Sequence, residues 1–184
     1  MERKTEESVV NRSLGFAVEL EQAPMRRIRG EWVLDVGPQR FQQTVLWKLI
    51  VNPAPLSGDH VRFMRLNLEK TMKALASHLG VSAAAVSKWE DKQEQPTQMN
   101  KGTEVLLRLF AAETLLDESG LSANQQDSVF HRVYEKVSQF DRTREPVSIC
   151  VTPDELQLAE NHPAHLPFDL AENVSKQGTN EIRA

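Results

Sequence analysis

Cysteine is almost missing from this chain, with Cys150 as the only example among 184 residues. A single thiol cannot form an internal disulfide, and it cannot supply a thiolate metal cluster within one chain. A secreted domain held together by disulfides is therefore excluded, and a reducing, cytoplasmic location is expected. Cys150 lies in an apolar strand pattern, which favours a buried thiol over a nucleophile.

Long hydrophobic runs are missing as well. No stretch of about 18 or more apolar residues occurs, and the N-terminus MERKTEESVVNRS is charged where a signal peptide would be apolar. We therefore expect neither secretion nor membrane association.

Motifs of catalysis and of cofactor binding are also missing. No serine or cysteine lies in a recognisable nucleophile motif, and no glycine-rich loop is present to hold a phosphate. His162 and His165 lie near Glu160 and Asp169, but Pro163 interrupts any helix that would align the imidazoles, so they are interpreted as loop histidines. The sequence thus predicts no enzyme, no catalytic residue, no cofactor and no metal site. The other histidines are expected to lie partly exposed on helices: His60, His78 and His131.

Hydrophobic residues make up 40% of the chain and charged residues 26%, so most of it should fold around a core of ordinary size. The net charge of −4 hides an asymmetry, since residues 1–56, 57–110 and 111–184 carry about +1, +2 and −7. A mildly basic centre beside an acidic C-terminal third suits a module that binds DNA, attached to a part that avoids it.

The N-terminal part, residues 1–51, is expected to be an accessory segment. Residues 1–13 have the polar composition of a mobile terminus. Short runs of β-branched and apolar residues follow from Leu14 to Val51, on both sides of the turn-like Gly37-Pro38, and they predict one or two strands. The stretch Phe41–Val51 fits either a short helix or a strand.

Residues 52–56 are predicted to be a linker, because Pro53 and Pro55 lack backbone donors and cannot continue a helix. Helical patterns then fill residues 57–116, and the chain as a whole is predicted to be mainly α. Residues 117–162 are a candidate for dimerisation. The C-terminal part is expected to hold a helix over 122–140 with valines at every fourth position, a short strand over 146–152 and a disordered tail over 163–184.

Three short helices are predicted after the linker. Ser57 is a capping residue for the first, which has apolar residues at Val61, Met64 and Leu68. Thr71 caps the second, which ends at Gly80, a residue that readily adopts the left-handed conformation. Ser82 caps the third after only Gly80-Val81, so the second and third helices must cross steeply. Core positions in these two helices are Leu75, Ala76, Leu79, Val86 and Trp89.

The run TMKALASHLGVSAAAVSKWE, residues 71–90, resembles the lambda-repressor-like (Cro/C1, or Xre) helix-turn-helix family. With the lead-in PLSG and RFMR, the likeness narrows to the DNA-binding half of MqsA and HigA-type antitoxins, and it covers about 55 residues. The resemblance implies a five-helix DNA-binding domain. The same pattern would also fit a small helical bundle in which it only builds a core.

This chain departs from the family at several positions. Met72 replaces the usual glutamine after the cap of the second helix, and Glu69 and Lys70 replace the usual glycine and leucine before it. The zinc-binding N-terminal domain of MqsA needs two pairs of cysteines, which are absent here. A zinc role is therefore not expected.

The resemblance implies particular contacts with DNA. The third helix would lie in the major groove with Ala83, Ala84 and Lys88 at base edges. Alanine methyl groups can touch thymine methyl groups, and Lys88 is the best polar candidate for reading a guanine. Phosphate contacts are expected from Ser82, Ala85, Ser87, the helix N-termini at Thr71 and Ser82, and the side chains of Lys70, Lys73 and Lys92.

Arg65 and Glu90 occupy positions that often hold an internal ion pair in this family, and the alternative is that both are solvated. The function implied is a transcriptional repressor that binds palindromic operator DNA as a homodimer, through helices after Leu106 and over 122–140. An antitoxin that blocks a toxin and represses its own operon is the alternative. An adaptor that has lost DNA binding is a third reading, which the alanine-rich third helix favours.

Overall fold

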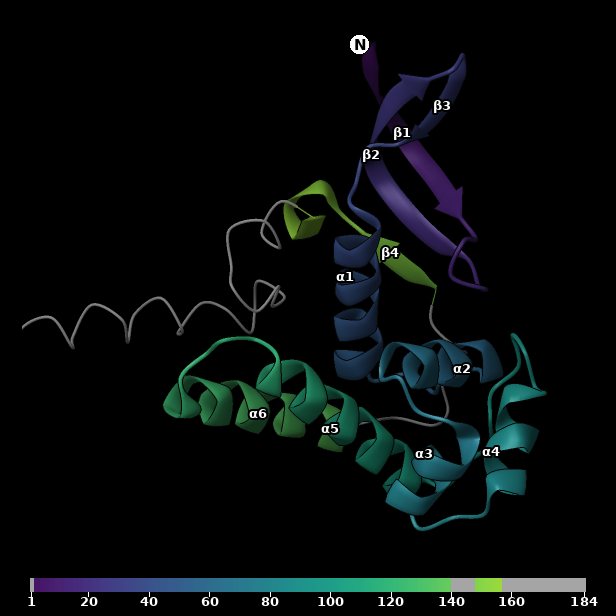
Figure 1. Cartoon of the computed structure of the whole chain (residues 1–184), viewed down its shortest axis with the longest axis vertical. Coiled ribbons are helices and arrows are strands. Elements are labelled where there is room, and N and C mark those ends of the chain that lie inside the picture. The colour runs from purple at the N-terminus through teal and green to yellow at the C-terminus, as the bar shows by residue number, and fades with distance from the viewer. Residues whose placement is uncertain (1, 140–147, 157–184) are drawn as a thin grey trace, which may run out of the picture.

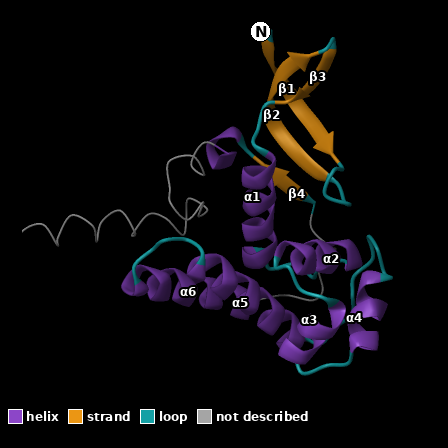
Figure 2. Cartoon of the chain, viewed as in Figure 1, coloured by secondary structure: helices purple, strands orange, loops and turns teal. Residues whose placement is uncertain are grey.

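The computed structural model describes residues 2–139 and 148–156, which form a helical body joined to a small β-sheet (Figures 1 and 2). The sheet lies at one end of the molecule, and the short helices after the predicted linker lie at the other (Figure 1). The predicted tail over 163–184 and the histidines His162 and His165 lie outside the described residues. Among the described helices, none has the length and apolar character needed to cross a membrane.

The sheet is an antiparallel meander of β1 (Arg3–Asn11), β2 (Val18–Ile28) and β3 (Glu31–Leu34). The prediction of a mobile terminus is wrong for β1, which pairs with β2 along its whole length. The reason is that this ladder satisfies backbone groups while most side chains of β1 stay exposed, so the strand lacks the apolar alternation that reveals a strand in a sequence.

The fourth strand, β4 (Ile149–Val151), pairs in parallel with the beginning of β2 and lies within the segment predicted as a strand. Val18 and Leu20 of β2 are paired with Ile149 and Val151, and all four side chains are buried. The predicted N-terminal and C-terminal segments therefore share one sheet.

Helix α1 (Pro38–Val51) settles the open choice for residues 41–51 in favour of a helix. It begins with Pro38, whose missing N–H is harmless in a first helical turn, and it ends before Pro53. Trp47 and Ile50 are fully buried, and α1 packs against β4 and the two long C-terminal helices. This helix therefore connects the sheet to the helical body.

The long helices α5 (Lys101–Asp117) and α6 (Ala123–Ser138) pack against each other and against α1. Val129, Val133 and Val137 of α6 are buried, as the four-residue spacing predicts. The short helices α2 (Gly58–Asn67), α3 (Met72–His78) and α4 (Ala83–Glu90) complete the helical body.

The predicted linker is held tightly by Arg108 of α5. Its guanidinium donates to the carbonyl oxygens of Leu49 at 2.7 Å and Ile50 at 3.2 Å, and to those of Asn52 and Ala54. These carbonyls belong to the C-terminal turn of α1 and to the linker, where the helix has no further donors of its own.

A carboxylate balances this buried cation. Arg108 Nη2 donates to Glu104 Oε1 at 2.8 Å, and the same oxygen accepts from the backbone N–H of Leu56 at 2.9 Å. Burial lowers the pKa of Arg108, and Glu104 acts in the opposite direction. The linker is therefore a fixed connection between α1 and α2.

Candidate nucleic-acid interface

Helices α3 and α4 each begin at a hydroxyl cap. Thr71 Oγ1 accepts from the backbone N–H of Ala74, and Ser82 Oγ accepts from that of Ala85, both at 3.1 Å. Each cap satisfies one donor of the first turn and leaves the neighbouring N–H groups directed outward. Both caps are exposed, so the N-termini of α3 and α4 are open to an anion.

The joint between α3 and α4 depends on Gly80. Its φ of +65° is a left-handed conformation, and the N–H of Val81 donates to the carbonyl of Ala76 at 2.9 Å. A Cβ at Gly80 would meet nothing within 4 Å, so glycine is favoured here by backbone conformation rather than by lack of space. The two helices pack directly against each other across this joint.

The outward face of α4 is nearly free of large side chains. Val86 is fully buried beneath it, and Lys88 is its exposed cation. Every residue predicted to contact DNA at this face has a side chain that solvent can reach. Those that are exposed are Thr71, Lys73, Ser82, Ala83, Ala84, Lys88 and Lys92, and those that are partly exposed are Ala85 and Ser87.

Lys70 differs from the other lysines predicted to contact phosphates. Its side chain is partly buried, and its amine lies 6.0 Å from the ring centroid of Phe110 on α5. His78 of α3 stacks on the same ring at 3.6 Å between centroids. Lys70 therefore lies beside the contact between α3 and α5, whereas Lys73 and Lys92 are exposed.

Arg65 and Glu90 are paired, so the alternative in which both are solvated does not hold. Their side chains are 11% and 5% exposed, and the Arg65 guanidinium contacts both carboxylate oxygens. Arg65 also donates to the carbonyl of Lys70 at 3.1 Å. The hydrogen bond to Glu90 raises the pKa of Arg65. One side chain thus links α2 to the end of α4 and to the chain just before α3.

Gly58 has a role that the sequence analysis missed. A Cβ there would lie 2.4 Å from the carbonyl oxygen of Trp89 and 2.6 Å from the backbone nitrogen of Gln93. The chain after α4 returns to this point, because the N–H of Asp59 donates to the carbonyl of Gln93 at 2.9 Å. The start of α2 and the end of α4 therefore approach as closely as only a glycine permits. In the sequence, the only indication of this close contact is that a glycine directly follows the Ser57 cap.

The expectation that His60 is partly exposed is wrong, since its side chain lies in the core at 6% exposure. It completes a capping box, in which Ser57 Oγ accepts from the N–H of His60 and His60 Nδ1 accepts from the N–H of Ser57. The ring also meets Phe16 edge to face, with centroids 4.7 Å apart. Burial, with a smaller effect of Arg108, lowers the pKa of His60 to about 4.

The expectation of a buried thiol at Cys150 is also wrong, because its side chain is half-buried. Ile149 and Val151 occupy the core face of β4, so the alternation of the strand places Cys150 on the opposite face. Its Sγ donates to Glu21 Oε1 at 3.4 Å. Burial, followed by this hydrogen bond, raises the pKa of the thiol.

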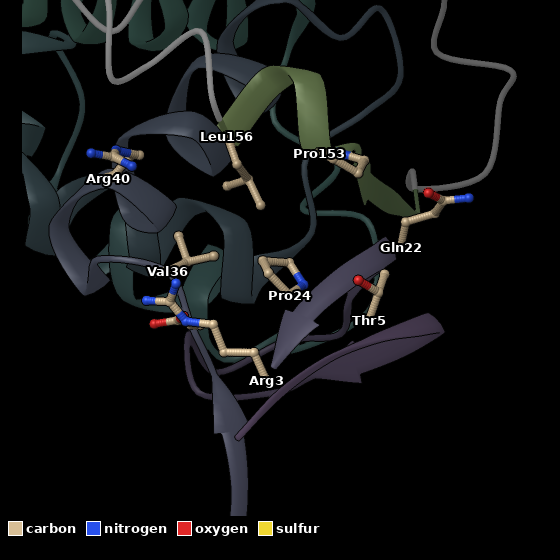
Figure 3. A pocket seen from close by; sticks show the side chains of 9 residues that line it. Arg3, Thr5, Gln22, Pro24, Val36, Arg40, Pro153 and Leu156 are labelled. Carbon is tan, nitrogen blue, oxygen red and sulfur yellow. The ribbon is translucent and has the colours of Figure 1, made fainter. Parts of the chain in front are cut away.

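A cavity of about 630 Å³ lies between the sheet and the C-terminal segment (Figure 3). The sheet is at the other end of the molecule from α3 and α4 (Figure 1). Arg3, Arg40 and Asp35 contribute charges to its wall, and Pro24 and Leu156 contribute apolar surface. Arg3 Nε already lies 3.1 Å from Asp35 Oδ2, so two of these charges are paired. Within the described part of the chain, no group of three or more His, Cys, Asp or Glu residues is placed to hold a metal ion.

Comparisons of the chain with protein families, curated proteins and solved structures find no match. The resemblance to the lambda-repressor-like family therefore stays an expectation from the sequence of residues 57–110.

Proposed function

We propose that this protein is a sequence-specific transcriptional repressor that binds operator DNA with α3 and α4. The observation that supports this function best is the pair of capped helices joined at Gly80, which leaves the outward face of α4 small and accessible. A helix of this kind can enter the major groove while the preceding helix crosses the backbone. The proposed domain comprises the four helices α2 to α5, which end at Asp117, so the five helices expected within residues 57–116 are four in the structure.

Each predicted contact has a physical basis in this arrangement. The exposed N-terminus of α4 at Ser82 and the exposed amines of Lys73 and Lys92 would bind phosphates. Ala83 and Ala84 would bring methyl groups to thymines, and Lys88 would donate to a guanine. With so few donors for base edges, most of the affinity would come from phosphates and from the shape of the DNA.

The rigid support of α4 is part of the proposal. The buried Arg65–Glu90 pair and the close contact at Gly58 both attach the C-terminal end of α4 to α2. A recognition helix held in this way keeps its base contacts in one geometry, which specific recognition requires. A half-site covers only a few base pairs, so we propose that the repressor acts as a homodimer on a palindromic operator.

The test is to select duplexes from a random pool with the purified full-length chain, and then to measure binding to the enriched duplex by fluorescence anisotropy at several salt concentrations. We expect an enriched motif with two inverted half-sites and an affinity that falls steeply as salt rises. A scrambled duplex of the same composition is the control for specificity. Selection without any enriched motif would contradict the proposal and favour the adaptor.

An antitoxin would share this DNA-binding behaviour, so a separate experiment distinguishes it. Each neighbouring reading frame is expressed alone to find one that stops growth, and co-expression of this chain with it should restore growth if the chain is an antitoxin. Failure to restore growth leaves the repressor as the proposed function.

A further inference from the structure

The outer edge of β1 is open among the described residues, since β1 pairs only with β2 on its other side. This strand lies at the rim of the sheet, at the end of the molecule away from α3 and α4 (Figures 1 and 2). An edge strand of this length is a template for another strand unless its side chains prevent pairing. The question is which partner these side chains fit.

The backbone groups that face outward can be identified from the ladder. The carbonyl of Glu2 accepts from the N–H of Arg27 on β2, so Glu2 and every second residue after it direct their groups toward β2. Thr5 lies opposite Pro24, which has no N–H and whose carbonyl accepts instead from Asp35. Arg3, Thr5 and Glu7 therefore present their N–H and C=O groups to the open edge.

A second copy of the same strand fits this edge in one antiparallel register. With Thr5 opposite the Thr5 of the second copy, Arg3 lies opposite Glu7 and Lys4 lies opposite Glu6. Arg3 and Lys4 already pair with Asp35 and Glu6 of their own chain, and in this register each also lies opposite a carboxylate of the second copy. Opposite charges at directly opposed positions stabilise an antiparallel pair. The residues with outward backbone groups then lie opposite each other. The hydrogen-bond pattern of the ladder therefore continues across the two-fold axis that relates the copies and passes between the two Thr5 residues.

Other two-fold registers of the same strand lack this match. Centring the pair on Lys4, Glu6 or Glu7 would place that charged residue opposite its own copy. A lysine at a sheet edge normally prevents pairing because like charges meet, but the register centred on Thr5 opposes each cation with an anion. The edge is therefore protected against most strands and complementary to its own.

We propose that β1 pairs with β1 of a second copy in this register, so that the two sheets become continuous in a homodimer. The interface differs from the helices expected from the sequence, because the apolar face of α6 is already buried inside one chain at Val129, Val133 and Val137. Pairing at this end leaves α3 and α4 of both copies uncovered (Figure 1). The proposal does not depend on DNA binding and is tested without DNA.

Disulfide trapping of the full-length chain tests the register. In a Cys150→Ser background, Thr5→Cys would bring two cysteines to opposed positions on the axis, with Cα atoms about 5.5 Å apart, a distance that a disulfide spans. The matched control is Ser8→Cys, three residues from the axis, where the two cysteines would be about 20 Å apart. Mild oxidation should crosslink the Thr5→Cys chain and leave the Ser8→Cys chain monomeric on a non-reducing gel. Equal crosslinking of both variants, or of neither, would overturn the proposal.

Charge exchange tests the pairing without a covalent bond. Lys4→Glu should raise the dissociation constant of the dimer at least about tenfold in sedimentation equilibrium, because carboxylates then oppose each other on both sides of the axis. The double variant Lys4→Glu with Glu6→Lys should restore the wild-type constant to within about threefold. Circular dichroism confirms that each variant is folded. A wild-type chain that stays monomeric, or a double variant as weak as the single one, would show that β1 is not the interface.

Discussion

Arg65 and Glu90 form a bidentate ion pair, with Nε 2.6 Å from Oε1 and Nη2 2.9 Å from Oε2, between α2 and the last residue of α4. Both side chains are largely withdrawn from water, so removing either one would leave an unpaired buried charge that destabilises the folded chain. The position of the proposed recognition helix therefore depends on a polar contact that is sensitive to single substitutions.

The pair should behave as one unit in a double-mutant cycle. Arg65→Ala or Glu90→Ala should each lower the free energy of unfolding by about 2 to 4 kcal/mol, and the double variant should lose clearly less than the sum. Urea denaturation measures all three values. Arg62→Ala removes an exposed arginine from the same helix and should change stability by no more than about 0.5 kcal/mol. Additive losses would contradict the coupling.

Gly58→Ala should destabilise the chain by at least about 1 to 3 kcal/mol, because the new methyl group would collide with backbone atoms of Trp89 and Gln93 that cannot turn away. Gly102→Ala is the matched control, since a Cβ there would meet only the side chain of Asn100, at 3.4 Å. Alanine is the better helix former, so this control should be neutral or stabilising by up to about 1 kcal/mol. Thermal unfolding compares the two, and equal effects would rule out a special constraint at Gly58.

Stability should fall as the pH is lowered from about 6.5 toward 4, partly because of His60. The pKa of His60 in the folded chain is about 4, below its ordinary value of 6.5, so the unfolded chain binds more protons within this interval. The stabilising contribution is therefore present above pH 6.5 and is lost as the pH falls, by about 2 kcal/mol between pH 7 and pH 5. Urea titrations across this range measure the slope.

His60→Gln isolates this contribution from those of other titrating groups. Glutamine can complete the capping box with Ser57 but does not titrate, so the variant should have a flatter pH dependence, whatever its absolute stability. His131→Gln, the same substitution at an exposed histidine of α6, is the matched control. A His60→Gln chain with an unchanged slope would show that His60 is not responsible.

Two lysines of the proposed interface should respond differently to substitution. Lys88→Ala should weaken the preference at one or two base pairs of each half-site by about 1 to 3 kcal/mol, because it removes a donor to a base edge. Lys73→Ala should weaken binding to specific and scrambled duplexes alike, and lower the salt slope by about one unit per half-site.

The control is Arg29→Asn, which removes one positive charge from the turn between β2 and β3 at the far end of the molecule. Asparagine tolerates the φ of +51° at this position. Binding by this variant should match the wild type. If the Lys88→Ala chain still prefers its operator over scrambled duplexes as strongly as the wild type does, Lys88 does not read a base.

The caps and the turn of the proposed interface were predictable from the sequence. Thr71, Ser82 and Gly80 act on backbone groups only a few residues away, so the spacing in the sequence already contains the interaction. The buried valines of α6 were predictable for the same reason, since a helix brings every fourth residue to one face.

Other features were decided only by contacts between distant parts of the chain. Residues 41–51 have apolar side chains suited to a helix or a strand, and burial of α1 against α5 and β4 selects the helix. His60 is a polar residue near a helix start in the sequence, and it is buried in the core, where the ring of the distant residue Phe16 packs against it.

The sequence by itself therefore determined where α2, α3 and α4 begin, that α3 ends before Gly80, and which side chains α4 leaves outward. Tertiary structure decided that β1 is a strand, that β4 joins β2, that Arg108 binds the end of α1 and that Gly58 touches the end of α4. The physical reason is distance along the chain. A cap or a helical repeat acts within a few residues, whereas a sheet edge, a buried guanidinium and a close backbone contact exist only after remote segments have come together.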